Sequence, residues 1–287
     1  MGRIAFVTDS TAAVPDNQKK EHDITVVPLQ VIFGTESFRD GVDLTQKEFF
    51  DRLKASKSLP TTSQPSVADF EQAYKKLLDD PNVDSIISIH LSSRLPSGTY
   101  SSATQAAERL SAGTQKKITV IDSHSAYMGE GVMVINASRA SKEGKSHDEV
   151  VKMVEDMRPK VRVLLLVDTL EYLQKGGRIG GAQAFLGGLL NIKPILQVKE
   201  GRVEPLERVR SRRKAMERLV EIAAEETRGK RCQVAVGHAE APEDAETLSK
   251  MIREKMDVAE EFNSELGPVI STHTGPGVLG FVYYPLD

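Results

Sequence analysis

Short runs of β-branched and other apolar residues alternate with helical patterns through the first half of the chain, and this alternation restricts the fold more than any other feature. Arg3–Thr8, Ser85–His90 and Lys117–Ile121 predict strands, each followed by small or polar turn residues. Helices are expected between them. Strands separated by helices are typical of βαβ units. The first half is therefore expected to be an α/β domain with a mainly parallel sheet.

Helix starts carry a local signal. Thr45 with Glu48, and Ser146 with Glu149, fit the capping box, in which a hydroxyl and a carboxyl bond free backbone N–H groups. A helix capped by Ser66 is also expected. After Ser146, three apolar residues fall on one helical face: Val150, Val154 and Met157. This spacing favours a helix that lies against a sheet.

A proline separates two regions of different pattern. Pro159 disfavours helical geometry in the residue before it, so the preceding helix is expected to end there. We place a domain boundary at this point, which divides the chain into residues 1–158 and 159–287. A chain of 287 residues exceeds the usual length of one domain, which agrees with this division.

The second half mixes strand patterns with two long helical ones, so a smaller α+β domain is expected. A hairpin is predicted around Glu200-Gly201, because alternating stretches flank that pair. The predicted strands are Val163–Val167, Ile195–Lys199, Arg202–Leu206, Gln233–Val236 and Phe281–Tyr284, and the predicted helices are Arg212–Thr227 and Glu243–Met256.

Composition excludes several classes of protein. The 41 acidic and 38 basic residues leave a formal charge of -3, which gives no electrostatic reason to expect nucleic acid as the main partner. No window approaches the roughly 20 apolar residues of a membrane span, and no signal peptide is recognised. Cys232 stands alone, so it excludes an internal disulfide and is expected to fill a strand core in a reducing compartment. A soluble, cytoplasmic protein is expected.

Polar loop segments at 60–65, 92–100 and 272–277 offer small donors on tight backbone. Ser97 precedes a predicted helix, so it could receive an anion at the positive helix end, although simple capping explains it as well. Thr62 and Ser63 are either ligand donors or turn residues. His273 could orient a carboxylate or a hydroxyl, or serve structure alone. The histidines show no metal-ligand spacing with a carboxylate or with Cys232, so no metal is predicted.

Two further segments have a structural interpretation. Residues 175–181 lack the Lys-Ser/Thr end of a P-loop, so they predict a helix end at Gly176-Gly177 and a second helix over Ala182–Asn191. Five basic residues follow, Arg208, Arg210, Arg212, Arg213 and Lys214. Such a run is more often a solvated face than a binding site, but its arginine content favours recognition of phosphate or carboxylate.

Eight short motifs, in this order, resemble those of the DegV family. They are Val7-Thr8-Asp9-Ser10-Thr11, Val27-Pro28-Leu29, Thr62-Ser63-Gln64-Pro65, Ser97-Gly98-Thr99-Tyr100, Val120-Ile121-Asp122-Ser123, Gly176-Gly177-Arg178-Ile179, Lys193-Pro194-Ile195 and His273-Thr274-Gly275-Pro276-Gly277. One such motif is weak, whereas eight in order over nearly the whole chain are highly specific.

The resemblance implies a two-domain lipid carrier rather than an enzyme. In that family a long-chain fatty acid, such as palmitate, stearate or oleate, lies in a tunnel between an N-terminal α/β domain and a smaller C-terminal domain. Its carboxylate is presented to a separate fatty acid kinase, which supplies ATP and metal for acyl-phosphate formation in phospholipid precursor metabolism. No other cofactor is implied, nor more than transient membrane contact.

The resemblance also implies the residues of the site. Thr62, Ser97 and His273 are expected to hold the carboxylate, with Ser63 beside them. The family usually runs Ser-Ser-x-Leu-Ser-Gly-Thr, whereas Pro96 is inserted here, so Ser93 is an alternative donor. The basic surface of Arg208, Arg210 and Arg212 is expected to dock the kinase.

Two other functions compete with the carrier. A Ser/His-dependent acyl hydrolase or transferase would use Ser97 or Thr62 as nucleophile and His273 as base, but there is no Gly-x-Ser-x-Gly elbow and no assignable third residue. A nucleic-acid-binding regulator rests on the arginine run alone, without a recognition-helix motif. The carrier is therefore the favoured hypothesis.

Overall fold

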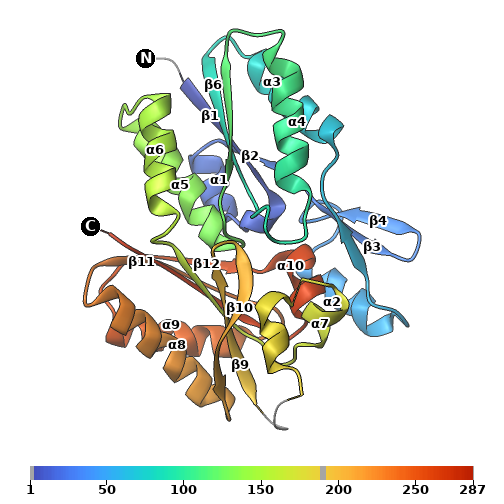
Figure 1. Cartoon of the computed structure of the whole chain (residues 1–287), viewed down its shortest axis with the longest axis vertical. Coiled ribbons are helices and arrows are strands. Elements are labelled where there is room, and N and C mark those ends of the chain that lie inside the picture. Colours follow the sequence, from blue (N-terminus) through green and yellow to red (C-terminus); the bar gives the residue numbers. More distant parts are fainter. Residues whose placement is uncertain (1–2, 188–191, 287) are drawn as a thin grey trace.

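The computed structural model describes residues 3–187 and 192–286. In the first half, four parallel strands form one sheet in the order β2-β1-β6-β7. Helices α3 and α4 cover one face of this sheet, and α5 and α6 cover the other (Figure 1). The strands are β1 (Arg3–Asp9), β2 (Ile24–Val27), β6 (Val83–His90) and β7 (Lys117–Asp122); the helices are α1 (Asp16–Glu21), α3 (Val67–Leu78), α4 (Thr99–Ser111), α5 (Met128–Lys142) and α6 (His147–Met157). The expected parallel sheet is confirmed.

The second half contains a six-stranded mixed sheet in the order β10-β9-β8-β13-β11-β12. Among its described pairs only β11 and β12 run parallel. Helices α8 and α9 pack on one face. The strands are β8 (Arg162–Leu166), β9 (Lys193–Lys199), β10 (Arg202–Val209), β11 (Cys232–His238), β12 (Val258–Glu265) and β13 (Leu279–Pro285); the helices are α8 (Arg212–Thr227) and α9 (Pro242–Lys255). The predicted hairpin joins β9 to β10, with positive φ at Glu200 and Gly201.

A third, antiparallel sheet of order β4-β3-β5 was not predicted. Its strands are β3 (Gln30–Phe33), β4 (Glu36–Arg39) and β5 (Thr61–Ser63), and α2 (Gln46–Ala55) follows β4. These strands have three or four residues and are mostly only partly buried, so they lack the apolar alternation that identifies longer strands. This small sheet matters because β5 carries Thr62.

Local signals for helices and core residues are confirmed. Capping boxes begin α2, α3 and α6 at Thr45, Ser66 and Ser146. The apolar face of α6 is buried, and so is Cys232 within β11. In contrast, the α-helix expected over Ala182–Asn191 is wrong for the residues that the structure describes, because Gly180–Phe185 forms a 3₁₀ helix, η2. Residues 188–191 lie outside the described residues.

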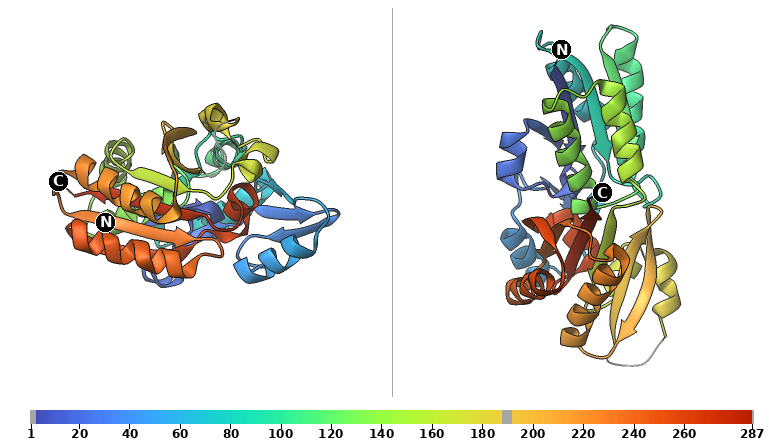
Figure 2. Two further views of the ribbon diagram at one scale, coloured as in Figure 1. Left: turned by 90° about the horizontal axis from the view of Figure 1, so that it is seen from below. Right: turned by 90° about the vertical axis from the view of Figure 1, so that its left-hand side faces the viewer.

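The two halves share one apolar core. Its buried residues come from β1 and α5 as well as from β8, β9 and β13. Short helix α10 (Gly267–Thr274), near the end of the chain, packs against β3, β5, α2 and η1 (Ser10–Ala12) of the first half and against α7 (Glu171–Lys175). Figure 2 shows the parallel sheet and the mixed sheet stacked along the long axis of the molecule. Helix α6 ends before the boundary placed at 158/159 and β8 begins after it, while the independence of the two domains stays a prediction.

No helix in residues 3–187 and 192–286 is long and apolar enough to cross a membrane.

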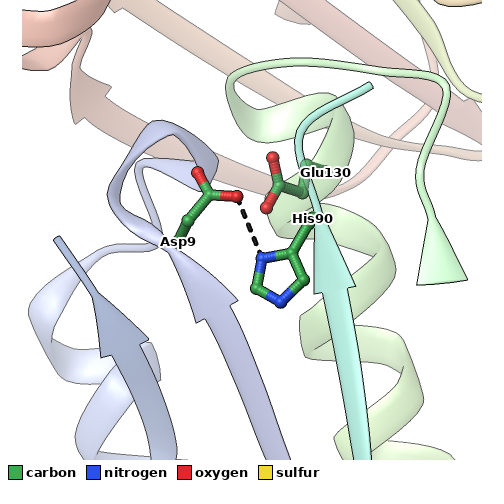
Figure 3. Close-up of side chains that lie close together, drawn as sticks. All are labelled: Asp9, His90 and Glu130. Carbon is green, nitrogen blue, oxygen red and sulfur yellow. Dashed lines mark hydrogen bonds and ion pairs between the residues drawn. The ribbon is translucent and has the colours of Figure 1, made fainter. Parts of the chain in front are cut away.

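Three buried ionisable side chains meet where β1 and β6 end beside α5 (Figure 3). Asp9 Oδ2 lies 3.1 Å from His90 Nδ1 and accepts the Leu91 N–H at 3.0 Å. Glu130 Oε1 accepts the Thr8 hydroxyl at 2.7 Å. Their polar atoms lie within 4.8 Å of one another, as in metal sites, but protein donors already bond them. We therefore interpret them as a hydrogen-bond network that fastens two strands to α5.

The pKa values of the two carboxyl groups in this network are shifted in opposite directions. Burial raises the pKa of Glu130 well above its ordinary value, and the nearby charge of Asp9 raises it further. Burial alone would raise the pKa of Asp9 as well, but hydrogen bonding and the charge of His90 lower it below its ordinary value. These opposite shifts favour a protonated Glu130 beside an ionised Asp9.

We expect Glu130→Gln to remove part of the pH dependence of folding. The folded state holds a proton on Glu130 above the unfolded pKa of 4.5. This contribution to the free energy of unfolding is fully present below that value and is lost as the pH rises through the folded pKa, by up to about 1.4 kcal/mol per pH unit. Urea denaturation from pH 5 to 8 should show glutamine gaining on the wild type as the pH rises. A difference that does not change with pH would contradict the protonated state.

Candidate ligand-binding cavity

A narrow cavity lies between the two halves, with walls from both, and its lining surrounds about 800 Å³ of empty space, part of which is open to solvent. Its lining is mainly aliphatic and aromatic. The apolar side chains are Leu29, Leu91, Leu95, Pro96, Ala126, Tyr127, Val163, Leu165, Leu173, Val198, Val203, Val269 and Ile270. Such a surface binds an apolar ligand through the hydrophobic effect.

Several hydroxyl groups of the wall bond the protein instead of opening into the cavity. Thr11 donates to Asp9 at 2.5 Å, and Thr274 donates to the Ile270 carbonyl at 3.0 Å. The Tyr127 hydroxyl lies 3.3 Å from the Ser264 carbonyl, which accepts its proton. Because these polar groups are already satisfied, this part of the cavity stays compatible with a hydrocarbon chain.

The remaining polar groups come from four distant parts of the chain. Thr62 on β5, Gln64 after it, Ser97 before α4, Arg178 after α7 and His273 on α10 all line the cavity. The Thr62 hydroxyl oxygen lies 2.8 Å from His273 Nε2. The Ser97 hydroxyl lies 2.8 Å from that of Thr99 in the first turn of α4. The positive end of the α4 dipole therefore lies beside Ser97, where it favours an anion.

Contacts between loops place Thr62 and Ser97 on the same cavity. The Gln64 side chain covers Gly98, where a Cβ atom would lie 2.7 Å from Gln64 Nε2. The loop before Ser97 is tied to the β9–β10 hairpin, because the Ser92 hydroxyl donates to the Gly201 carbonyl at 3.0 Å. Pro96 lines the cavity next to Ser97, so its insertion leaves Ser97 at the wall.

His273 is neutral at physiological pH. Burial, and then the positive charge of Arg178, lower the pKa of His273 to about 3. Its other ring nitrogen, Nδ1, is buried and has no hydrogen-bond partner among the described residues. A Ser/His hydrolase needs a third group at this nitrogen to orient the base. The described residues supply none.

Comparison with known proteins identifies the family. The family model described as "Uncharacterised protein, DegV family" matches residues 3–286. The chain belongs to the DegV family. Protein DegV of Bacillus subtilis (strain 168) is 38% identical over 282 residues, which are 98% of each chain.

Solved structures agree with this assignment. The structure described as "Fatty Acid Binding of a DegV family Protein from Thermus thermophilus" is 38% identical, with a TM-score of 0.92, over 99% of this chain and 100% of that one. A stearic acid-binding protein from Eubacterium ventriosum is 27% identical, with a TM-score of 0.91, over 99% of this chain and 98% of that one. The mixed α/β fold of this chain is that of the DegV proteins.

Arg178 is a cavity residue that sequence reasoning missed. Its guanidinium donates to the Gly176 carbonyl at 2.6 Å and pairs with no carboxylate among the described residues. Burial lowers the pKa of Arg178, which nevertheless stays charged. The loop lacks the end of a P-loop and so gives no sign of a ligand by spacing; the signal for Arg178 is its place in the motif Gly176-Gly177-Arg178-Ile179.

Two of the expected ligand donors lie away from this cavity lining. The Ser63 hydroxyl donates to the Gln64 carbonyl at 3.2 Å. Ser93 is exposed, and its hydroxyl donates to Asp122. Neither residue lines the cavity, whereas Thr62, Ser97 and His273 do. The structure thus brings together the three main residues and leaves out the two additional ones.

The three arginines expected to dock a partner differ from one another. Arg208 stacks on the Phe185 ring, 4.5 Å from its centroid, and donates to a backbone carbonyl. Arg212 bonds Asp168 and Asp244. Arg210 is exposed and has no ion-pair partner among the described residues. Arg210 is therefore the arginine most available to another molecule.

We expect Gly176→Ala to disturb the site by displacing the His273 ring. A Cβ atom at Gly176 would lie 2.4 Å from His273 Nδ1, although the φ of -77° suits any residue. Overpacking of this kind costs about 1–3 kcal/mol of stability. The control Gly113→Ala, where the nearest atom would be 3.8 Å away, should cost far less.

Denaturant unfolding of the single and double variants checks this contact. In a His273→Ala background the ring is gone, so Gly176→Ala should cost clearly less than in the wild type. Equal costs in both backgrounds would show that the ring is not what excludes a side chain at this position.

Proposed function

We propose that this chain binds one long-chain fatty acid between its two halves and presents the carboxylate to a separate kinase for acyl-phosphate formation. The observation that carries the proposal is the half-buried Thr62–His273 hydrogen bond at the polar part of an otherwise apolar cavity. A DegV family protein of Thermus thermophilus and a protein of Eubacterium ventriosum, which share this fold, are described as binding fatty acid and stearic acid. The combination suits an amphiphile with one small anionic head.

Burial of the tail supplies most of the affinity. About 14 buried methylenes at ~0.8 kcal/mol each would contribute roughly 10 kcal/mol before the cost of association. The cavity wall is suited to this, because Thr11 and Thr274 direct their hydroxyls to the protein. The tail therefore holds the ligand, and the polar residues are left to orient it.

Neutral donors orient the head group. With its proton on Nε2, His273 donates to Thr62 and leaves only an acceptor, Nδ1, without a partner. The Thr62 hydroxyl is then free to donate to the carboxylate, and Ser97 offers a second hydroxyl. A carboxylate held by hydroxyls keeps its charge and its nucleophilic oxygen, which phosphoryl transfer needs.

Arg178 adds positive potential without a fixed salt bridge. Its half-buried guanidinium faces no carboxylate among the described residues, so its field is available to an anionic ligand. The same charge favours neutral His273. Arg178 therefore favours both the anion and the neutral form of His273.

The partner kinase would supply ATP and metal and would meet an exposed basic surface. Arg210 lies between β10 and α8 and has no ion-pair partner among the described residues. An unpaired exposed arginine accelerates and orients encounter with an acidic partner. We therefore propose that Arg210 is the main docking residue, with Arg208 and Arg212 as its supports.

We expect Thr62→Val to loosen the head group while leaving the tail bound. Valine keeps the shape of threonine but removes one donor, and a hydrogen bond to a charged group contributes about 1.5–3 kcal/mol. Release of palmitate, measured by competition, should accelerate by about 10- to 150-fold. Acyl-phosphate production with the cognate kinase and ATP should fall as well, because in-line transfer depends on positioning.

Thr61→Val is the matched control, since Thr61 is exposed on the same strand and does not line the cavity. Circular dichroism should confirm that both variants are folded. If folded Thr62→Val released palmitate and supported acyl-phosphate production at the same rates as the wild type, the head group would bind elsewhere.

We expect Arg210→Glu to affect the kinase reaction and not the binding of the acid. Charge reversal should weaken acyl-phosphate formation most at low salt, where exposed charges are least screened. Palmitate affinity should stay unchanged. Arg231→Glu, at an exposed arginine before β11, is the control. If acyl-phosphate formation with Arg210→Glu matched that with Arg231→Glu at every salt concentration, Arg210 would be an ordinary solvent-exposed residue with no role in docking.

A further inference from the structure

Helix α10 is held at both ends by residues from the first half of the chain. Its last turn carries His273, whose ring bonds Thr62. At its first turn, Gly267 lies against the carboxylate of Asp40, which lies between β4 and α2. The Gly267 N–H bonds Gln46 Oε1 at 3.4 Å. Asp40 and His273 are thus connected through eight residues of helix.

The first turn of α10 depends on these distant partners. Leu266, at the N-cap position, makes no side-chain cap, and Pro268 has no N–H to satisfy. Gly267 has a φ of +73°, and a Cβ atom there would lie 3.5 Å from Asp40 Oδ1. The helix therefore begins directly against the Asp40 carboxylate, where a negative charge is favoured.

Asp40 is buried without a cation. Asp40 is only 5% exposed, and its Oδ1 atom has no hydrogen-bond partner among the described residues. Burial raises the pKa of Asp40 to about 7, against hydrogen bonds from Ser10 and Val269 that lower it. The charge of Asp9 raises it further. Asp40 thus changes its charge close to neutral pH.

Other charged groups lie around Asp40 in a polar groove of about 530 Å³. Asp9 ends β1, Asp16 and Lys19 belong to α1, and Glu265 ends β12. Lys19 pairs with Asp16 at 2.5 Å, so its charge is already neutralised locally. The groove therefore presents mainly negative charge to Asp40 and favours its protonation as the pH falls.

We propose that Asp40 is a positioning residue for the head-group site, which anchors α10 when ionised and loosens its hold on His273 when protonated. The inference rests on the proposed binding of a fatty acid. Besides His273, α10 contributes Val269, Ile270 and Thr274 to the cavity wall. A proton on Asp40 would therefore reach the carboxylate site through the helix, without direct contact with the ligand.

The histidine of the site does not produce the same response. Since the pKa of His273 is about 3, it stays neutral between pH 5.5 and 8.5. The carboxyl of the ligand titrates in every variant alike. A difference in pH profile between the wild type and an Asp40 variant therefore isolates Asp40.

The experiment measures release of palmitate from pH 5.5 to 8.5 in the wild type and in Asp40→Asn. Wild-type release should accelerate about 2- to 30-fold as the pH falls through 7, the range for a charge at a helix end. Asp40→Asn, which is neutral throughout, should lack this step and release quickly at every pH. Asp84→Asn, at an exposed residue of β6 outside the groove, should keep the wild-type profile.

Ser10→Ala provides a second variant if Asp40→Asn does not fold. It removes a hydrogen bond that lowers the pKa of Asp40, so the step in release should move to higher pH. If palmitate bound to all three proteins and its release had the same pH profile in the wild type, Asp40→Asn and Ser10→Ala, the inference about Asp40 would be wrong. The proposed function would still stand. A wild type that binds no palmitate at any pH would overturn the proposed function and this inference with it.

Discussion

Helix α10 lies where the two halves of the chain meet, and the candidate site depends on that packing. The helix follows β12 of the mixed sheet in the chain, yet it contacts β3, β5 and η1 of the first half. One end meets Asp40 and the other meets Thr62. Without this contact, Thr62 and His273 would belong to separate surfaces, and the cavity would lose a wall. The shared core and the site thus have the same structural origin.

Polar groups in the interior are arranged so that one part of the cavity is apolar and one part is not. Thr11 takes part in the Asp9–His90–Glu130 network, and this keeps its hydroxyl bonded within the protein. Ser97, Thr62 and neutral His273 remain as the groups able to meet a head group. An amphiphile requires this separation of apolar and polar walls. An unsatisfied hydroxyl beside the tail would cost free energy, and so would a carboxylate without hydrogen-bond donors at the head.

Much of the framework could be predicted because its signals are local. The capping box at Ser146 and the apolar run of β1 each involve neighbouring residues. The motifs containing Thr62 and His273 were recognisable as a resemblance, although spacing alone left structural roles open for both. The β4-β3-β5 sheet was missed since its strands are too short to show a period. Asp40 and Arg178 were missed because what distinguishes them is their nearness to residues of α10, Asp40 to Gly267 and Arg178 to His273, far away in the sequence.

The central claim is that the cavity between the halves holds one fatty acid. Native mass spectrometry of protein purified from a bacterial host, followed by denaturing lipid extraction and gas chromatography, tests it most directly. A buried tail makes dissociation slow, so we predict that the folded protein carries about one equivalent of a long-chain fatty acid that denaturation releases. A protein that carries no acyl chain, and also takes up neither palmitate nor oleate when they are added, would contradict the account.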